Sequence, residues 1–209
     1  AGEAVIRITT TTICGTDIHI LKGEYPVDRG RIVGHEPVGV IVELGAGVTG
    51  FQEGQRVIVG AITPCGQCYS CLSGHRSQCG GKAMGGWRFG NTIDGCQAEY
   101  VRVPFAMANL SPVADGLTDE QVLMCPDIMS TGFAGAENAD IQIGDVVVVF
   151  AQGPIGLCAT AGARLRGAGC IIAVDGMPAR LAVAKKMGAD VTIDFHDQDP
   201  VQAVMDLTR

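Results

Sequence analysis

The stretch Val146-Val-Val-Val-Phe-Ala-Gln-Gly-Pro-Ile-Gly156 decides the fold of the second half of the chain. An unbroken apolar run at its start is typical of a strand buried in a parallel sheet. Gly153 and Gly156 then occupy the second and third glycine positions of the G-x-G-x-x-G pattern, and Ala151 stands where the first glycine would be. The stretch therefore predicts a strand, a tight loop and the beginning of a helix.

The sequence after this loop continues the alternation of strands and helices. The pattern predicts helices at 154–166 and 179–187 and strands at 170–174 and 191–195. Alternation at this spacing indicates a parallel sheet with right-handed crossovers, that is, a doubly wound α/β domain of the Rossmann type.

Such a loop is suited to the pyrophosphate of a dinucleotide. Gly153 lets the backbone approach the phosphates, Gly156 lets the helix pack closely on the strand, and the free N–H groups of the first helical turn attract the anion. Asp175, at the end of the next strand, is placed to bind the adenosine ribose, and its charge would repel a 2′-phosphate. NAD is therefore expected rather than NADP, although Asp175 could merely begin a turn and Arg180 lies close in sequence.

Four cysteines dominate the first half of the chain. Cys65, Cys68, Cys71 and Cys79 follow the spacing C-x2-C-x2-C-x7-C. Four thiolates this close can wrap one metal ion tetrahedrally, as in a structural zinc site whose positions are all filled by protein. We expect zinc in this cysteine lobe (residues 65–79); His75 as a replacement for one thiolate is the weaker alternative.

The rest of the first half is rich in short β-strands separated by glycine-bearing turns, at 38–42, 56–59 and 100–103 among others. The character changes near Thr118, where Thr118 and Gln121 have the spacing of a helix capping box. We expect one domain at residues 1–126 and a second at 127–209. The chain begins inside a strand pattern and stops inside a helical one, so we expect both ends to be incomplete.

Composition narrows the classes of function. The 209 residues are 47% hydrophobic and 18% charged, with net charge -7 and a pI of about 5.0. An acidic chain without a basic cluster is a poor ligand for nucleic acid or for an anionic membrane. Nine cysteines, an odd number with metal spacing, favour a reducing cytoplasmic setting over disulfides.

Taken in order, several motifs together resemble the zinc-dependent medium-chain alcohol dehydrogenases. They are Cys14-Gly-Thr-Asp, Gly34-His-Glu, the cysteine lobe, Ser130-Thr-Gly-Phe and the glycine loop. The segments Gly86-Trp-Arg-Phe-Gly-Asn91 and Pro126-Asp-Ile-Met-Ser-Thr-Gly132 resemble the bacterial secondary-alcohol branch most. The resemblance covers nearly the whole chain and implies a GroES-like catalytic domain followed by part of a Rossmann domain.

The resemblance also implies roles for individual residues. A catalytic zinc would be held by Cys14, His35 and Asp127, with Glu36 entering or leaving its coordination shell. Cys125 is the competing ligand, but relatives place theirs four residues before the threonine that is Thr131 here. Thr16 and His19 would relay the alcohol proton, and Trp87 would border the substrate pocket. The residues assigned to the cofactor are Thr131, Gly153, Pro154, Ile155, Gly156, Asp175 and Arg180.

The expected function is reversible oxidation of a secondary alcohol to a ketone, or of an alcohol to an aldehyde, with two zinc ions and NAD per chain. The chain mixes features, because NADP-binding secondary-alcohol relatives carry a small residue at the position of Asp175 and many lack the lobe. A polyol or formaldehyde dehydrogenase and a non-catalytic zinc and nucleotide binder stay open as alternatives. We expect the full-length protein to form a homodimer or homotetramer. The sequence leaves open whether residues 1–209 alone catalyse the reaction.

Overall fold

The computed structural model describes residues 1–208, which form two compact units. The first unit runs from Ala1 to Asp127, and the second begins at Ile128. The boundary expected from the sequence lay one residue earlier, so Asp127, expected at the start of the second domain, belongs to the first unit together with Cys14 and His35.

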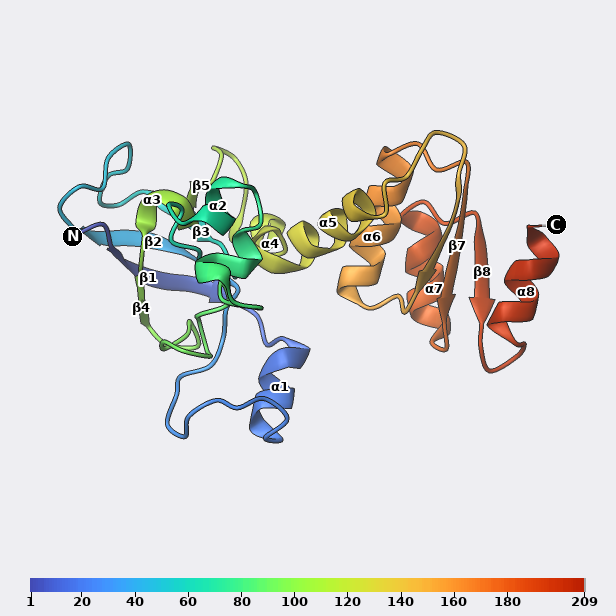
Figure 1. Cartoon of the computed structure of the whole chain (residues 1–209), viewed down its shortest axis with the longest axis horizontal. Helices are drawn as coiled ribbons and strands as arrows, with labels where there is room; N and C mark the ends of the chain where they lie inside the picture. Colours follow the sequence, from blue (N-terminus) through green and yellow to red (C-terminus); the bar gives the residue numbers. More distant parts are fainter. Residues whose placement is uncertain (209) are drawn as a thin grey trace. The chain divides into compact units, whose positions relative to one another are not determined.

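The first unit is built on an antiparallel sheet with strand order β4-β1-β2-β3-β5 (Figure 1). Its strands are β1 (Ala4–Thr11), β2 (Pro37–Leu44), β3 (Arg56–Val59), β4 (Tyr100–Val103) and β5 (Leu110–Pro112). The alternation of β1 places Ile6 opposite Ile41 on one side and Val101 on the other. These residues join Phe89 in a fully buried core, which fixes the register because a slip of one residue would expose them.

Short helical segments lie between and after these strands. They are α1 (Gly15–Leu21), α2 (Tyr69–Leu72), the 3-10 helix η1 (Arg76–Gly81), α3 (Ala106–Asn109), α4 (Asp119–Val122) and the π-helix η2 (Cys125–Met129). The capping box expected at the start of α4 is confirmed, since Thr118 and Gln121 exchange both hydrogen bonds. Pro126 lies inside the π-helix and interrupts the regular α-helical pattern there. Single wide turns of this kind often occur at functional sites.

The second unit contains a parallel sheet with strand order β6-β7-β8. Its elements are α5 (Ser130–Asn138), β6 (Val146–Phe150), α6 (Pro154–Leu165), β7 (Cys170–Asp175), α7 (Pro178–Lys186), β8 (Val191–Asp194) and α8 (Pro200–Leu207). The expected order of strands and helices is confirmed, with boundaries that differ by one or two residues. Ile171 and Ile172, neighbours on β7, point into separate clusters on opposite faces of the sheet.

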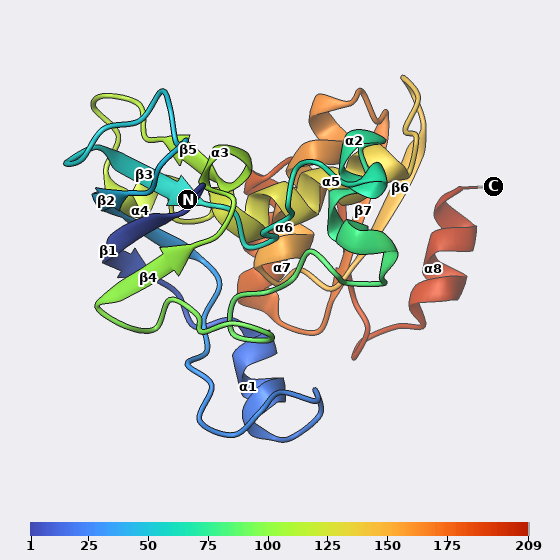
Figure 2. The same cartoon turned by 60° about the vertical axis from the view of Figure 1, so that its left-hand side comes forward.

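Helices cover both of these faces. Residues of α5 and α6 pack with Ile171, and Figure 2 shows these two helices side by side from a second direction. On the other face, α8 packs beside β8 over the cluster that contains Ile172 (Figure 1). At Gly132 of α5 an added Cβ would lie 2.6 Å from the Cβ of Cys158 on α6, so the two helices approach at a glycine. Among the described residues, no helix combines the length and apolar character that a membrane crossing requires.

Candidate catalytic metal centre

Three separate segments of the first unit bring four potential ligands together. Cys14 immediately precedes α1, His35 and Glu36 immediately precede β2, and Asp127 lies in the π-helix η2. One ligating atom from each lies within 4.8 Å of the others. Among the described residues this group includes Asp127 and not Cys125.

The nitrogen and oxygen atoms of this group point toward one another. His35 Nε2 lies 3.4 Å from a carboxylate oxygen of Asp127 and 3.8 Å from Oε1 of Glu36. The side chains of His35 and Glu36 are almost wholly buried. Sulfur, nitrogen and oxygen in one small group is the ligand chemistry of catalytic zinc.

The electrostatics of the centre call for a positive charge. Burial opposes protonation of His35, but hydrogen bonds and attraction from Asp127 and Cys14 outweigh it and raise the pKa of His35 to about 10. Oε1 of Glu36 is buried without a hydrogen-bond partner, which is costly for a carboxylate oxygen. A divalent cation would satisfy both demands, so the residues fit zinc.

Residues around the four potential ligands contact them and hold them in place. Asp17, on the first turn of α1 and 2% exposed, accepts hydrogen bonds from the backbone N–H of Cys14 and from Gln97 Nε2, both at 2.9 Å. Its other oxygen lies 3.8 Å from Nδ1 of His35. The Thr12 hydroxyl donates to Oε2 of Glu36 at 2.7 Å.

Sequence reasoning missed both supporting residues. Asp17 could have been found from the sequence, because an acidic side chain three residues after an N-cap residue commonly accepts a hydrogen bond from the backbone N–H of that residue. Nothing in the sequence pattern pointed to Thr12, whose contact depends on how β1 and β2 pair.

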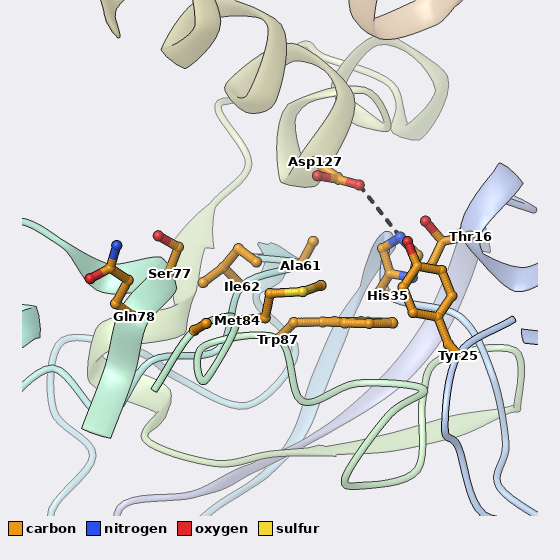
Figure 3. A pocket seen from close by; sticks show the side chains of 11 residues that line it. Thr16, Tyr25, His35, Ala61, Ile62, Ser77, Gln78, Met84, Trp87 and Asp127 are labelled. Carbon is orange, nitrogen blue, oxygen red and sulfur yellow. Dashed lines mark ion pairs between the residues drawn. The ribbon is translucent and has the colours of Figure 1, made fainter. Parts of the chain in front are cut away.

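The centre opens into a cavity of about 340 Å³ in the first unit. Figure 3 shows Thr16, Tyr25 and His35 at one end, with Asp127 facing His35, and Ser77 and Gln78 at the other. The side chains between these ends are mostly apolar: Ala61, Ile62, Met84 and Trp87.

Of the residues that the resemblance assigned to the substrate pocket and the proton relay, Trp87 and Thr16 line this cavity, whereas His19 does not line it in the described structure. His19 instead pairs with the carboxylate of Glu24, and both side chains are about half exposed. Trp87 is 8% exposed, donates from its indole N–H to the Phe89 carbonyl at 3.0 Å, and meets the ring of Tyr25 edge-on.

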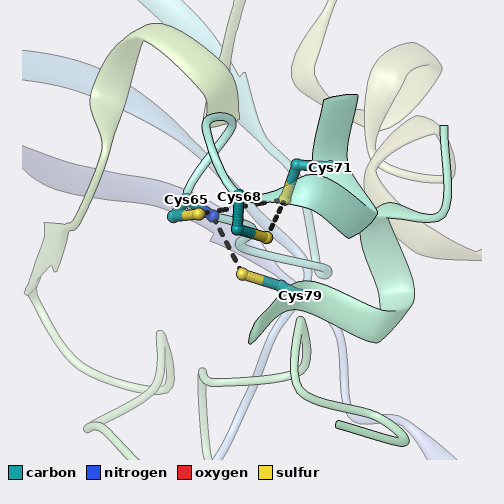
Figure 4. Close-up of side chains that lie close together, drawn as sticks. All are labelled: Cys65, Cys68, Cys71 and Cys79. Atoms are coloured by element: carbon teal, nitrogen blue, oxygen red, sulfur yellow. Dashed lines mark hydrogen bonds between the residues drawn. The ribbon is translucent and has the colours of Figure 1, made fainter. Parts of the chain in front are cut away.

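The cysteine lobe forms a second potential metal site (Figure 4). Its four Sγ atoms lie within 4.8 Å of one another, with Cys68 and Cys71 separated by 3.4 Å and Cys65 and Cys71 by 3.9 Å. A tetrahedron with Zn–S bonds of about 2.3 Å has S–S edges of about 3.8 Å. Backbone hydrogen bonds from Gly80 and Cys71 lower the pKa of Cys68 to about 6, which favours the thiolate that a metal needs. Burial raises the pKa of Cys71 to about 11, so a metal that binds there must displace a proton.

The nucleotide loop lies wholly in the second unit. Gly153 precedes α6, and space is open around its Cα, whereas an added Cβ on Gly156 would lie 1.8 Å from the Ala151 carbonyl oxygen. Pro154 and Ile155 occupy the first turn of α6, and Thr131 lies on α5.

Asp175 is 3% exposed and ends β7. Its two carboxylate oxygens accept the backbone N–H groups of Gln152 at 2.6 Å and Met177 at 2.8 Å. Burial would raise the pKa of Asp175, but these bonds and the Arg180 guanidinium, 3.6 Å away, hold it below the ordinary 3.8. The carboxylate is therefore ionised, and it also makes the turn that was the alternative interpretation.

Comparison with known proteins places both units in one family. Residues 1–115 match the alcohol dehydrogenase GroES-like domain, and residues 154–209 match the zinc-binding dehydrogenase domain. The chain belongs to the zinc-dependent medium-chain alcohol dehydrogenase family. The expected fold, a GroES-like domain with a Rossmann-type domain, is thereby confirmed for this chain.

Individual relatives are similar over almost the entire chain. An alcohol dehydrogenase of Cupriavidus necator is 65% identical over 99% of this chain and 60% of its own length. An NADP-dependent isopropanol dehydrogenase of Thermoanaerobacter brockii is 40% identical over 99% of this chain and 59% of its own. The solved alcohol dehydrogenase TADH from Thermus sp. ATN1 aligns with a TM-score of 0.88 at 35% identity, over 99% of this chain and 60% of that one. The chain thus spans about 60% of the length of these relatives.

Proposed function

We propose that the protein is a zinc-dependent oxidoreductase that reversibly oxidises an alcohol, preferably a secondary one, by hydride transfer to NAD. The observation that carries this proposal is the convergence of Cys14, His35, Glu36 and Asp127 beside a largely apolar cavity. Membership of the alcohol dehydrogenase family and the similarity to an isopropanol dehydrogenase support it.

Cys14, His35 and Asp127 would hold the catalytic zinc, with Glu36 as a further carboxylate within reach. A thiolate and a carboxylate together balance the two charges of the ion, while the neutral imidazole adds none. When bound, zinc would lower the pKa of the alcohol hydroxyl and the nicotinamide would accept the hydride.

The chain's own residues would orient the alcohol and remove its proton. The Thr16 hydroxyl lines the cavity at the end where His35 and Asp127 lie, so it is placed to accept that proton. His19, three residues further along α1 and partly exposed beside Glu24, would pass the proton to water. The faces of Trp87 and Ile62 would contact the longer carbon substituent of a secondary alcohol where it extends toward Gln78.

NAD is the proposed cofactor because Asp175 is an ionised, buried acid at the end of β7. Each of its oxygens retains a second lone pair for a ribose hydroxyl, whereas a 2′-phosphate would meet its charge. Arg180 offsets part of that charge, so we expect a preference for NAD of moderate size rather than complete exclusion of NADP. The cysteine lobe would hold the second zinc, and assembly into a dimer or tetramer stays a prediction.

One observation favours a second candidate, a polyol dehydrogenase. Ser77 and Gln78 place two hydrogen-bonding side chains at the end of the cavity away from His35. A substrate with a second hydroxyl could bind them, whereas a simple alkyl alcohol would leave them to water.

The deciding experiment follows NADH and NADPH formation by the full-length protein with propan-2-ol, ethanol and a polyol, alongside the zinc content. Two zinc ions per chain, turnover of propan-2-ol and a higher kcat/KM with NAD are expected. One zinc per chain, unchanged by Cys14→Ser and without turnover of any of the three substrates, would instead support the non-catalytic alternative.

A further inference from the structure

The cysteine lobe contributes directly to the cavity at the catalytic centre. Ser77 and Gln78 immediately precede Cys79 on the 3-10 helix η1, and both line the same cavity as His35 and Asp127. The lobe is therefore part of the pocket's surface as well as a surface loop.

Backbone contacts connect Cys79 to the pocket wall on the other side of η1. The N–H of Gly86 donates to the carbonyl of Ser77 at 3.0 Å. An added Cβ on Gly86 would lie 2.6 Å from the Arg76 carbonyl oxygen, and one on Gly85 would lie 2.2 Å from that of Cys79. Glycine is required at both positions because the backbone of η1 lies directly on this segment.

This segment leads at once into Trp87. Its backbone N–H donates to the Met84 carbonyl at 3.0 Å, and its ring lines the cavity and meets His35 at a centroid distance of 6.5 Å. A short chain of contacts thus runs from the sulfur of Cys79 through η1 and Gly86 to the aromatic wall beside the metal centre.

We propose that the metal held by the cysteine lobe determines substrate specificity by holding this wall of the alcohol pocket in place. The inference rests on the proposed function, because it assumes a lobe metal and an alcohol substrate. When the metal leaves, the constraint that four ligands place on Cys79 is lost, so η1 and Trp87 are free to shift. The reactive end of the cavity, with Thr16, His35 and Asp127, lies away from η1 and should change little.

The consequence depends on the length of the substrate. Propan-2-ol fits at the reactive end, whereas a secondary alcohol with a long chain must reach along Trp87 toward Gln78. Loss of the lobe metal should raise KM for octan-2-ol by roughly tenfold, a change typical of altered apolar pocket contacts, and alter kcat/KM for propan-2-ol less than about threefold. If the metal served only to stabilise the lobe, its loss would change the kinetic constants for octan-2-ol and propan-2-ol to a similar extent.

The test compares full-length enzyme with Cys65→Ser, which removes a lobe ligand that does not line the cavity. Metal content shows whether the lobe is empty, and the fluorescence of Trp87, taken as the difference from Trp87→Phe in each background, reports on the wall independently of activity. In Cys65→Ser, the emission of Trp87 should shift to the red and acrylamide should quench it more readily. Parent enzyme stripped of metal should show the same changes, and returning zinc to the lobe should reverse them. Ser73→Ala, which alters an exposed serine of the lobe without touching a sulfur, is the matched control and should leave the emission unchanged.

A second variant keeps the inference open to refutation where Cys65→Ser does not fold. Gly86→Ala pushes η1 away from the wall while all four sulfurs remain, so it should retain the lobe metal and still raise KM for octan-2-ol. A folded, lobe-empty enzyme with unchanged Trp87 emission and unchanged KM for octan-2-ol overturns the inference, as does Gly86→Ala with unchanged KM. A parent enzyme with no lobe metal contradicts the two-zinc proposal itself, which is a separate and recognisable outcome.

Discussion

Asp17→Asn tests whether the catalytic centre depends on residues that do not touch the metal. In the structure one Asp17 oxygen accepts N–H groups from Cys14 and Gln97, and the other faces Nδ1 of His35 at 3.8 Å. Asparagine has the same shape and can keep the first pair of bonds through its oxygen. Its amide NH2 would then face His35, where the carboxylate oxygen had been.

That exchange alters which nitrogen of His35 carries the proton. An amide donor favours the imidazole tautomer with an unprotonated Nδ1, which places the hydrogen on Nε2. Nε2 is the atom that faces Asp127 and Glu36, and it can bind a metal only without its hydrogen. Loss of such a supporting contact typically weakens metal binding 10- to 100-fold, or by about 1.4 to 2.8 kcal/mol.

The assay is competition for zinc between the protein and a chromophoric chelator, with the cysteine lobe loaded in both proteins. Asp28→Asn serves as the control, because it removes one negative charge from an exposed site away from the cluster. Asp17→Asn should bind the catalytic zinc at least tenfold more weakly, whereas Asp28→Asn should match the parent. A folded Asp17→Asn protein with zinc affinity within threefold of the parent would refute the argument from the tautomer of His35.

Three further predictions follow from particular contacts. Thr12→Val removes the 2.7 Å hydrogen bond to Glu36 and should lower the free energy of unfolding of the metal-free protein by about 1.5 to 3 kcal/mol, with Thr12→Ser restoring it. Chemical denaturation checks this, and an equal loss with zinc bound would count against it, because zinc offers the carboxylate a second partner. Gly156→Ala forces a Cβ to within 1.8 Å of the Ala151 carbonyl oxygen, so NADH binding, followed by its fluorescence, should weaken at least about tenfold; near-parental affinity would contradict it. Hydrogen bonds from a threonine hydroxyl and an arginine hold the pKa of Asp119 below its ordinary 3.8. The stability that this carboxylate contributes to the fold is therefore present above pH 3.8 and disappears as the pH falls through the lower, folded-state pKa. Asp119→Asn should therefore lower stability at pH 7 by about 1 to 2 kcal/mol and lose this difference in acid, which denaturation at several pH values can measure.

The elements that the sequence predicted well are those fixed by near neighbours. The run Val146–Phe150 forms β6, and the Thr118 and Gln121 pair caps α4, because each pattern specifies its own local hydrogen bonds or burial. The four cysteines of the lobe are likewise close enough in sequence for their spacing to constrain their arrangement.

The catalytic group could be proposed only through resemblance, because its members come from distant parts of the chain. Nothing in the spacing of Cys14, His35 and Asp127 requires them to meet; the pairing of β1 with β2 and the position of η2 bring them together. The same limit explains why no position in the pocket could be predicted for residues of the cysteine lobe. The position of Gln78 in the cavity depends on how η1 packs on Gly86, a contact that no local pattern encodes.

The departure at Ala151 shows how the nucleotide loop tolerates a residue that its motif disfavours. Ala151 has a φ of 68°, a left-handed conformation that costs a residue with a Cβ about 1 to 2 kcal/mol. Its neighbour Gln152 is wholly buried, accepts from the Thr160 hydroxyl at 3.0 Å, and donates its backbone N–H to Asp175. These bonds hold the loop in the strained conformation that glycine would adopt without cost. Asp175 therefore has two tasks, and the acid proposed to select NAD is also one that the fold of the loop requires. A change of preference toward NADP must then replace its hydrogen bonds to the loop as well as remove its charge.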